Sequence, residues 1–196
     1  MHSDGNINDH QVRLRIAEKD NEVLYRFNEA LNGDLPIKQE AYTVNRKTPV
    51  SNLTICSSKM VKDLLKYGIK ENKTFDLKFY NFDKPELTKA YICGIFDGDG
   101  WCSFGENSRE IGFCGTYDTC EGIKNFLEKE CSAVNIRITP IKSIYRIRIC
   151  NKASIVNIYE KIFLENKKLC LSRKFNQIEE FAVSERAHVN RKVALK

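Results

Sequence analysis

The predicted order of strands and helices in the first half of this chain recurs in its second half. Chemically distinctive residues recur with it, and the matching pairs are Asp4-Gly5 with Asp99-Gly100, Asp20 with Asp118, Ile55-Cys56 with Ile149-Cys150, and Lys73 with Lys174. The spacing is kept as well, because 52 residues separate Asp4 from Cys56 and 51 separate Asp99 from Cys150. A repeat of this length predicts a duplicated α/β unit rather than a short solenoid repeat.

Composition excludes several other classes of protein. Hydrophobic residues make up 42% of the 196 positions and charged residues 30%, which suits a globular chain of one domain or two small ones. Apolar runs are far shorter than a membrane span, and the polar start MHSDGNINDH is unlike a signal or transit peptide, so we expect an intracellular protein. The net charge of +6 suits a polyanionic partner without proving one.

The spacing of the eight cysteines argues against disulfides and structural zinc. No two cysteines are closer than six positions, there is no C-x-x-C pair, and the three histidines lie away from them. A structural zinc site needs paired ligands at short spacing. Several cysteines occupy apolar phases of predicted strands, as Cys56 and Cys150 do, so we interpret the cysteines as reduced thiols in the core.

The hydrophobic pattern divides the chain into halves of residues 1–82 and 83–184, followed by a loose basic tail over 185–196. Alternation predicts strands over 11–17, 37–44, 50–56, 101–104, 110–115, 134–139 and 143–150. Helical periodicity predicts helices over 22–31, 58–67, 83–96, 118–129, 153–163 and 172–181. Asp83 with Glu86 forms a candidate capping box, and Asp20 and Asp118 are interpreted as helix caps.

The segment AYICGIFDGDG carries the most chemical information. Ala90, Gly94 and Gly98 are four residues apart and form a stripe of small residues on a helix, against which another helix backbone can pack closely. Asp97 and Asp99 then lie at the helix C-terminus, where the helix dipole disfavours a carboxylate. Two such helices side by side would bring carboxylates together, and a divalent cation that prefers oxygen ligands, such as Mg²⁺, would remove that repulsion.

This segment resembles the LAGLIDADG motif of homing endonucleases through YICGIFDGDG. The contexts Leu171-Ser172-Arg173-Lys174 and Gly68-Ile69-x-x-x-Lys73-Thr74 fit the same resemblance, which extends from Ser3 to about Phe181. The resemblance implies an α+β fold with a duplicated αββαββα arrangement, pseudo-twofold symmetry and two antiparallel, saddle-shaped sheets over double-stranded DNA. It also implies a monomer, since one chain supplies both halves.

By this resemblance, Asp4 and Asp99 are the acids that bind Mg²⁺ or Mn²⁺ at the centre of the site. Lys73 and Lys174 map to the basic residues that stabilise charge on the scissile phosphate. Asp97 occupies the motif position that supports the end of the helix. The implied reaction is metal-dependent hydrolysis of a phosphodiester bond in each strand of a DNA duplex.

The first copy of the motif departs from the family pattern. Met1-His2-Ser3-Asp4-Gly5 matches only its last five positions, so the first interface helix is nearly absent from the sequence. Three explanations stay open. Translation starts upstream of Met1, which we favour because the rest of the chain reads as intact, or the copy is degraded, or another chain supplies the helix.

Polar and basic residues on one face of predicted strands are the candidate DNA contacts. Gln11, Arg13 and Arg15 alternate with apolar residues in one strand, and Arg146 and Arg148 do so in another. Such a ribbon can enter the major groove and contact guanine edges or phosphates. The hairpin residues that could extend this surface are Arg46, Lys47, Arg137 and Lys142.

Two functional classes remain open at this point. The presence of both Asp4 and Asp99 favours a site-specific DNA endonuclease. Loss of the first helix favours an inactive remnant or a nucleic-acid-binding protein without cleavage, such as an intron maturase or a DNA-binding regulator. Trp101 and Phe104 are interpreted as core residues rather than base-stacking groups. The abundance of Lys, Asn and Ile fits a gene from a phage, acting in the bacterial cytoplasm, or from an organelle.

Overall fold

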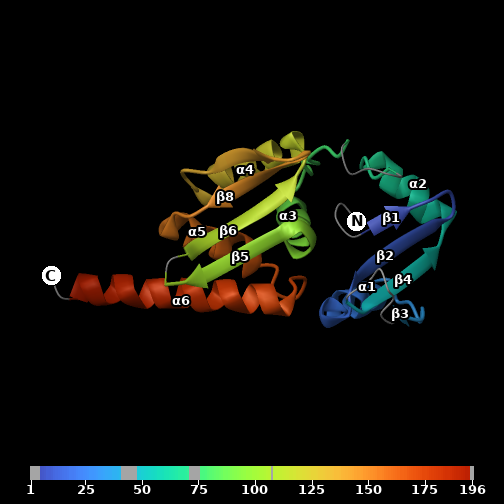
Figure 1. Cartoon of the computed structure of the whole chain (residues 1–196), viewed down its shortest axis with the longest axis horizontal. Coiled ribbons are helices and arrows are strands. Elements are labelled where there is room, and N and C mark those ends of the chain that lie inside the picture. Colours follow the sequence, from blue (N-terminus) through green and yellow to red (C-terminus); the bar gives the residue numbers. More distant parts are fainter. Residues whose placement is uncertain (1–4, 41–47, 71–75, 107, 195–196) are drawn as a thin grey trace. The chain divides into compact units, whose positions relative to one another are not determined.

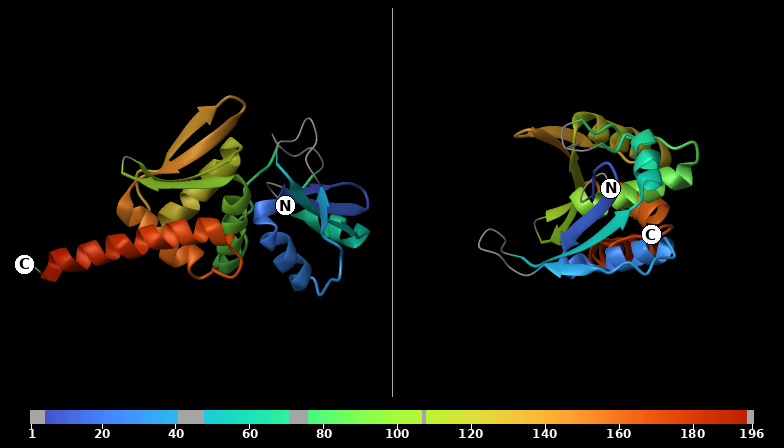
Figure 2. Two further views of the ribbon diagram at one scale, coloured as in Figure 1. Left: turned by 60° about the horizontal axis from the view of Figure 1, so that its bottom comes forward. Right: turned by 90° about the vertical axis from the view of Figure 1, so that its right-hand side faces the viewer.

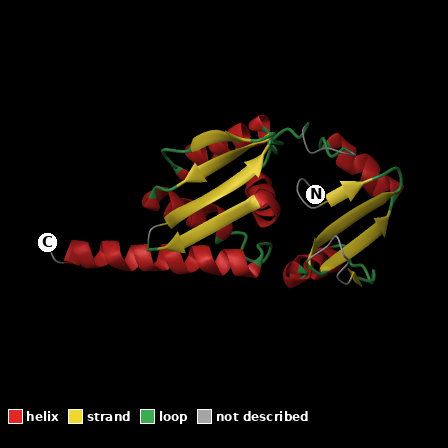
Figure 3. Cartoon of the chain, in the orientation of Figure 1, coloured by secondary structure: helices red, strands yellow, loops and turns green. Residues whose placement is uncertain are grey.

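The computed structural model describes residues 5–40, 48–70, 76–106 and 108–194. The chain forms two compact units, residues 1–77 and 78–196, so the division falls a few residues before the boundary expected after residue 82 (Figure 1). Each unit consists of an antiparallel sheet with helices packed against it (Figure 3). The protein is therefore of the α+β class, as predicted.

The sheet of the first unit has the strand order β1-β2-β4-β3. Its strands are β1 (Gly5–Ile7), β2 (Gln11–Ala17), β3 (Lys38–Glu40) and β4 (Val50–Cys56). A short 3₁₀ turn, η1 (Glu18–Asp20), leads into helix α1 (Glu22–Ala30), and helix α2 (Ser58–Lys66) follows β4. Leu24 of α1 and Val61 of α2 pack on the buried side chains of the sheet, Val12 and Leu53 among them.

The sheet of the second unit has the order β5-β6-β8-β7, which is the same order in terms of chain position. Its strands are β5 (Gly100–Gly105), β6 (Ser108–Gly115), β7 (Arg137–Ile141) and β8 (Ile144–Ile149). Its helices are α3 (Pro85–Asp99), α4 (Tyr117–Cys131), α5 (Lys152–Ile158) with the π-helical turn η3 (Tyr159–Phe163), and α6 (Ser172–Ala194). The shared strand order confirms the duplicated architecture predicted from the repeat.

Each sheet buries one face under the helices of its own unit and leaves the other face open among the described residues (Figure 2). In β2, Val12 and Leu14 are buried while Arg13 is exposed, and in β8, Ile147 is buried while Arg148 is exposed. This alternation with a period of two is the pattern of a sheet with one covered side. We call the uncovered side of each sheet its open face.

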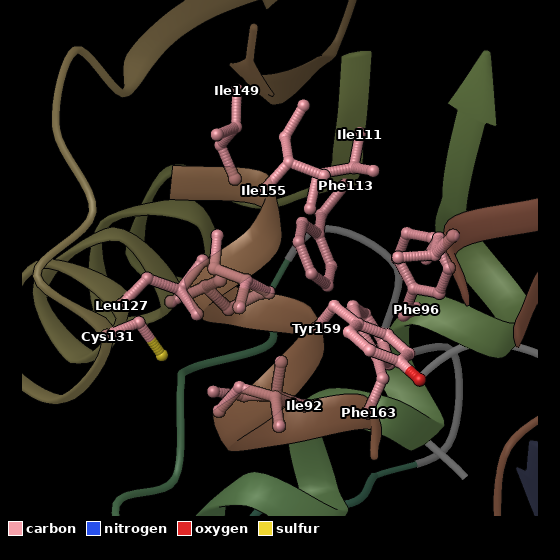
Figure 4. Packing of buried hydrophobic residues seen from close by; sticks show 14 of the residues in the cluster. Ile92, Phe96, Ile111, Phe113, Leu127, Cys131, Ile149, Ile155, Tyr159 and Phe163 are labelled. Atoms are coloured by element: carbon pink, nitrogen blue, oxygen red, sulfur yellow. The ribbon is translucent and has the colours of Figure 1, made fainter. Parts of the chain in front are cut away.

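The larger core belongs to the second unit and joins its sheet to α3, α4, α5 and α6. Phe96 of α3 meets Phe113 of β6 and Phe163 of η3, with ring centroids 5.3 and 4.9 Å apart (Figure 4). All three rings are almost completely buried. Because Phe96 lies about one helical turn before Asp99, this core packing fixes the position of the end of α3.

Three of the predicted helix caps are wrong. Lys84, not Asp83, is the N-cap of α3, no side chain caps that end, and Thr88 instead accepts a hydrogen bond from the Phe82 amide (3.1 Å). In α4 the cap is Thr116, whose hydroxyl accepts from the Thr119 amide (3.1 Å). Asp118 therefore lies in the first turn. Asp20 ends η1, and α1 begins after Asn21 without a side-chain cap.

Several predicted boundaries also change. Helix α3 continues through Asp97 and Gly98 to Asp99, three residues beyond the predicted end. The predicted loose tail is helical, because α6 extends to Ala194. Of the strand predicted over 37–44, residues 38–40 form β3 and positions 41–44 lie outside the described residues.

The cysteines divide into buried and exposed thiols, all of them free. Cys93, Cys120, Cys131 and Cys170 are buried, as predicted. Cys56 and Cys150 are exposed, which corrects their assignment to the core. Cys56 has the same open-face phase in β4 as Asn52, and Cys150, directly after β8, continues the phase of Arg148. The buried phase carries Ile55 and Ile149. None of the described helices is both long and apolar enough to span a bilayer.

Candidate nucleic-acid interface and metal site

Asp99 is the last residue of α3 and its side chain is exposed. The strand register pairs Gly100 with Phe113, so Asp99 lies level with Cys114, and Cys114 pairs with Arg146. Burial and the negative charge of Asp99 raise the pKa of the Cys114 thiol, while Arg146 acts in the opposite direction. Asp99 therefore lies at one end of a row of open-face residues that runs across the sheet through Cys114 to Arg146.

Lys174 anchors the end of α3 from α6. Its ammonium donates to the backbone carbonyls of Phe96 (2.7 Å), Asp97 (2.7 Å) and Gly100 (2.6 Å), and the residue is 5% exposed. An ammonium has three N–H donors, so these carbonyls account for all of them. Its positive charge also suits the negative end of a helix. The structure thus gives Lys174 a positioning role, and its action on a phosphate stays a prediction.

Asp97 completes a reciprocal connection between α3 and α6. Its carboxylate accepts a hydrogen bond from the Leu171 amide (2.9 Å), at the residue before α6 begins. Asp97 thereby satisfies a backbone donor at the N-terminus of α6, while Lys174 satisfies carbonyls at the C-terminus of α3. This agrees with the supporting role that the motif resemblance implied for Asp97. The two side chains hold the backbone that carries Asp99.

The open face of the second unit carries the predicted residues Arg137, Arg146 and Arg148. Arg137 pairs with Arg148 across β7 and β8, so their side chains share this face. Arg146 donates from Nε to the Thr139 hydroxyl (3.3 Å). Lys142 lies at the tip of the β7–β8 hairpin with a left-handed φ of 53°. The three arginines therefore share one face of the sheet, and their contact with DNA, like that of Lys142, stays a prediction.

The open face of the first unit carries Gln11, Arg13 and Arg15, in the predicted alternation with buried residues. Arg15 donates from Nη2 to Glu40 of β3 (2.6 Å). The other oxygen of Glu40 accepts from the Asn52 side chain of β4 (2.9 Å). The first unit therefore presents basic residues together with an acid that pairs with one of them.

Four predicted site residues lie outside the described part of the chain, namely Asp4, Arg46, Lys47 and Lys73. The structure consequently leaves the pairing of Asp4 with Asp99 as a prediction. Within the described residues, no group of three His, Cys, Asp or Glu side chains is placed to hold a metal ion. A cation at Asp99 would therefore need further oxygen ligands from outside the described side chains, such as water or phosphate oxygens.

Trp101 and Glu110 are open-face residues that the sequence interpretation missed. The Trp101 ring lies on Gly112, where a Cβ would come within 2.4 Å of two ring atoms, and its Nε1 donates to Glu110 (2.9 Å). The interpretation of Trp101 as a core residue is therefore wrong, whereas Phe104 stacks on Phe181 on the covered side. Strand parity was the available signal, because residues 101 and 104 are three apart and point to opposite faces.

Glu110 joins this aromatic residue to the basic row. Its carboxylate accepts from Nε of Arg148 (2.8 Å) and also from Nη2 of the same guanidinium. Partial burial raises the pKa of the Glu110 carboxyl, but hydrogen bonds from Trp101 and Arg148 outweigh it and hold the pKa below its ordinary value. Glu110 is therefore a carboxylate at neutral pH.

Comparison of the sequence with protein-family models and with curated proteins gives no match. Comparison of the structure with solved structures does. The meganuclease I-AabMI bound to uncleaved DNA aligns over 95% of this chain and 88% of its own, with a TM-score of 0.58 and 10% identity. The homing endonuclease I-SmaMI bound to cleaved DNA aligns over 93% and 80%, with a TM-score of 0.57 and 9% identity.

A third similar structure is full-length DUF199/WhiA from Thermatoga maritima. It aligns over 99% of this chain but only 61% of its own, with a TM-score of 0.56 and 14% identity. Both kinds of neighbour contain the LAGLIDADG fold, and the duplicated β1-β2-β4-β3 and β5-β6-β8-β7 sheets place this chain in the same fold. The fold implied by the YICGIFDGDG resemblance is thus confirmed.

Proposed function

We propose that this protein binds double-stranded DNA on its two open faces and hydrolyses phosphodiester bonds as a site-specific endonuclease. The observation that carries the proposal is the position of Asp99, an exposed carboxylate at the edge of an open face whose neighbouring rows hold Arg146, Arg148 and Arg137. Basic rows bind phosphates, and a divalent cation held by Asp99 would turn an exposed acid that repels DNA into a site that attracts a phosphate.

The acid suits Mg²⁺ or Mn²⁺, because these ions prefer carboxylate oxygens and readily share phosphate oxygens. Asp99 would hold the ion, with Asp4 as the second acid that the motif resemblance implies. A bound divalent ion neutralises phosphate charge and lowers the pKa of a bound water. The chain's own contribution is to fix the acid, since Lys174 and Asp97 lock the end of α3, and to orient the DNA through its arginines.

Two further features of this proposal follow from the duplicated fold. The substrate is a duplex, since the structural neighbours I-AabMI and I-SmaMI are bound to DNA and both open faces here carry basic rows. The protein acts as a monomer, because one chain contains both sheets. Light scattering of the purified chain should give a mass near 22.7 kDa.

A second candidate is a DNA-binding protein that does not cleave. One observation favours it, namely that the Lys174 ammonium, which the motif resemblance assigns to charge stabilisation at the scissile phosphate, donates to three backbone carbonyls instead. DUF199/WhiA shows that the LAGLIDADG fold is not restricted to proteins described as endonucleases.

Cleavage of a plasmid library with randomised inserts distinguishes these candidates. We expect Mg²⁺-dependent linearisation of a subset of plasmids, and Asp99→Asn should lower the rate at least about a hundredfold while DNA binding is kept. Asp83→Asn removes an equal charge from an exposed position outside the site and should cut normally.

Binding should weaken with salt, with a slope of about 0.9 in log units for each phosphate neutralised. Salt-dependent binding without cleavage by the wild-type chain would support the second candidate. Cleavage that survives Asp99→Asn would overturn the assignment of the acid.

A further inference from the structure

Each open face holds one arginine that is already paired with a carboxylate on another strand of the same sheet. In the second unit Glu110 pairs with Arg148, and in the first unit Glu40 pairs with Arg15. In both cases the second carboxylate oxygen is also used, by Nε1 of Trp101 and by Nδ2 of Asn52 respectively. The positions of the partners differ, because Arg148 lies on β8 beside the strand of Glu110, whereas β4 separates Arg15 on β2 from Glu40 on β3. In both units an acid with two side-chain donors holds one arginine of the open face.

An acid on a DNA-binding surface reduces the attraction of that surface for phosphates. Glu110 cancels most of the charge that Arg148 would offer to a phosphate at this point. Ion pairs whose arginine is exposed to solvent, as Arg148 and Arg15 are, also contribute little to fold stability. Neither phosphate binding nor stability therefore accounts for the arrangement.

The geometry of the Arg148 pair fits base recognition better. Glu110 occupies the guanidinium edge formed by Nε and Nη2. A guanidinium is a planar fork of five N–H donors, so the edge formed by Nη1 and the second Nη2 hydrogen is left for another acceptor pair. The N7 and O6 atoms of guanine in the major groove are such a pair. A fixed fork loses less conformational freedom when it binds.

We propose that Glu110 is a positioning residue for sequence recognition, which orients Arg148 to read a guanine in the major groove. Glu40 and Arg15 perform the same task in the first unit. Arg13, Arg137 and Lys142 lack such a carboxylate among their described contacts and bind phosphates instead. This inference rests on the proposed binding of duplex DNA, and it adds which arginines read bases.

In the second unit, the exposed fractions of the two side chains agree with a positioning role for Glu110 and a base-reading role for Arg148. The Glu110 side chain is 18% exposed and the Arg148 side chain 44%, so the acid is the sheltered partner and the arginine the outer one. The Trp101 ring packs on Gly112, where a Cβ would collide with it, and its Nε1 donates to Glu110. The Glu110 carboxylate is therefore held by Trp101 through one oxygen and by Arg148 through the other.

Selection of duplexes from a randomised DNA pool by the full chain tests the inference. The pool retained by the wild-type protein should contain a fixed guanine in each half of the site. Glu110→Gln should lower the preference for one of these guanines roughly five- to a hundredfold, the discrimination of a bidentate arginine–guanine contact, and raise retention of the unselected pool. Glu40→Gln should act on the other guanine.

Three variants make the result specific. Arg148→Lys should lose the same guanine as Glu110→Gln, because lysine has no fork. Trp101→Phe keeps a ring on Gly112 but removes the hydrogen bond to Glu110, and it should give a smaller loss at that guanine. Glu128→Gln removes an equal charge from α4, where Glu128 pairs with Lys124, and should leave the selected sequence unchanged.

The outcomes separate this inference from the proposed function. If Glu110→Gln selects the same guanine as wild type, or if Arg148→Lys and Glu110→Gln alter different positions, the inference is wrong while DNA binding stands. If the wild-type chain retains no duplex at low salt, the proposed function itself fails. Circular dichroism of each variant confirms its fold, and Trp101→Phe with Arg148→Lys decides the matter should Glu110→Gln not fold.

Discussion

At the scale of single residues, the buried ammonium of Lys174 is the contact most closely tied to the candidate metal site. Its carbonyl partners on α3 and at Gly100 precede and follow Asp99 in the chain. A change at Lys174 therefore acts on the acid through the backbone and can alter activity without any contact between Lys174 and DNA. Stability measurements separate this effect from a direct role.

Lys174→Met should lower the free energy of unfolding by about 2–4 kcal/mol, because three buried or part-buried carbonyls lose a charged donor. Urea denaturation followed by circular dichroism measures the change. Lys168→Met removes an exposed lysine from the segment before α6 and serves as the matched control, with an expected change within about 0.5 kcal/mol. Equal stability of the two variants would show that the carbonyl contacts contribute nothing.

Lys142 holds an unusual backbone conformation for a residue with a long side chain. Its φ of 53° lies in the left-handed region that glycine and asparagine occupy most easily. Lys142→Asn should therefore be as stable as wild type or slightly more stable, while DNA affinity falls for all sequences alike and the salt slope drops by about one. Fluorescence anisotropy over a salt series measures both, and Lys168→Asn is the control. A sequence-dependent loss would instead assign Lys142 to base recognition.

At the scale of secondary-structure elements, the segment before α3 is built into the second unit. The Phe79 amide donates to Asp118 (2.7 Å), and the Phe79 ring lies 5.4 Å from that of Tyr91. Gly122 of α4 makes room for it, because a Cβ there would come within 2.2 Å of the Phe79 ring. These contacts explain why the second unit begins at Lys78 and not at the predicted helix start.

Gly122→Ala tests this arrangement with opposing effects. Alanine favours a helix by about 1 kcal/mol over glycine, but the added Cβ must displace Phe79, at a cost of about 1–3 kcal/mol. We expect the clash to dominate, with faster tryptic cleavage at Lys78 than in wild type. Gly105→Ala meets no atom within 4 Å and should digest like wild type. Slower cleavage of Gly122→Ala would mean that Phe79 does not depend on this contact.

The elements that the sequence predicted best are those with a local signal. Alternation in β2 and β8 identified the covered and open faces correctly, since Val12 and Ile147 mark the covered side. The predictions that failed depended on distant contacts. Asp118 looked like a cap for its own helix but accepts a hydrogen bond from Phe79, and Thr116 is the cap.

In the candidate site too, features with a local sequence signal were predicted and features that depend on distant contacts were not. Asp99 and the arginine rows were visible in the motif and the alternation. The pairing of Glu40 with Arg15 joins residues 25 positions apart, and that of Glu110 with Arg148 joins residues 38 positions apart. Such partners depend on strand order and register, which the sequence pattern does not determine, so the acids on the open faces went unrecognised.

At the scale of the whole molecule, equivalent positions in the two units should respond to DNA together. Cys56 and Cys150 offer a direct probe, because both thiols are exposed and both continue the open-face phase of their strands. Burial raises the pKa of Cys120 to about 12 and that of Cys131 to about 11, so these thiols are almost entirely protonated near pH 8 and react slowly.

Alkylation with iodoacetamide at pH 8, followed by peptide mass mapping, should therefore label Cys56 and Cys150 first in the free protein. Excess duplex DNA at low salt should slow both reactions about tenfold or more, since a duplex on both open faces covers both thiols at once. Cys102 lies on the covered side of β5, where its thiol donates to Gln177 (2.9 Å), and its labelling rate should not change.

Protection of only one exposed thiol would confine DNA binding to one unit. Protection of Cys102 with neither exposed thiol protected would place the DNA on the covered side of the sheet. Protection of both, with Cys102 unaffected, is the result expected of a protein that binds DNA through the open face of each of its two sheets.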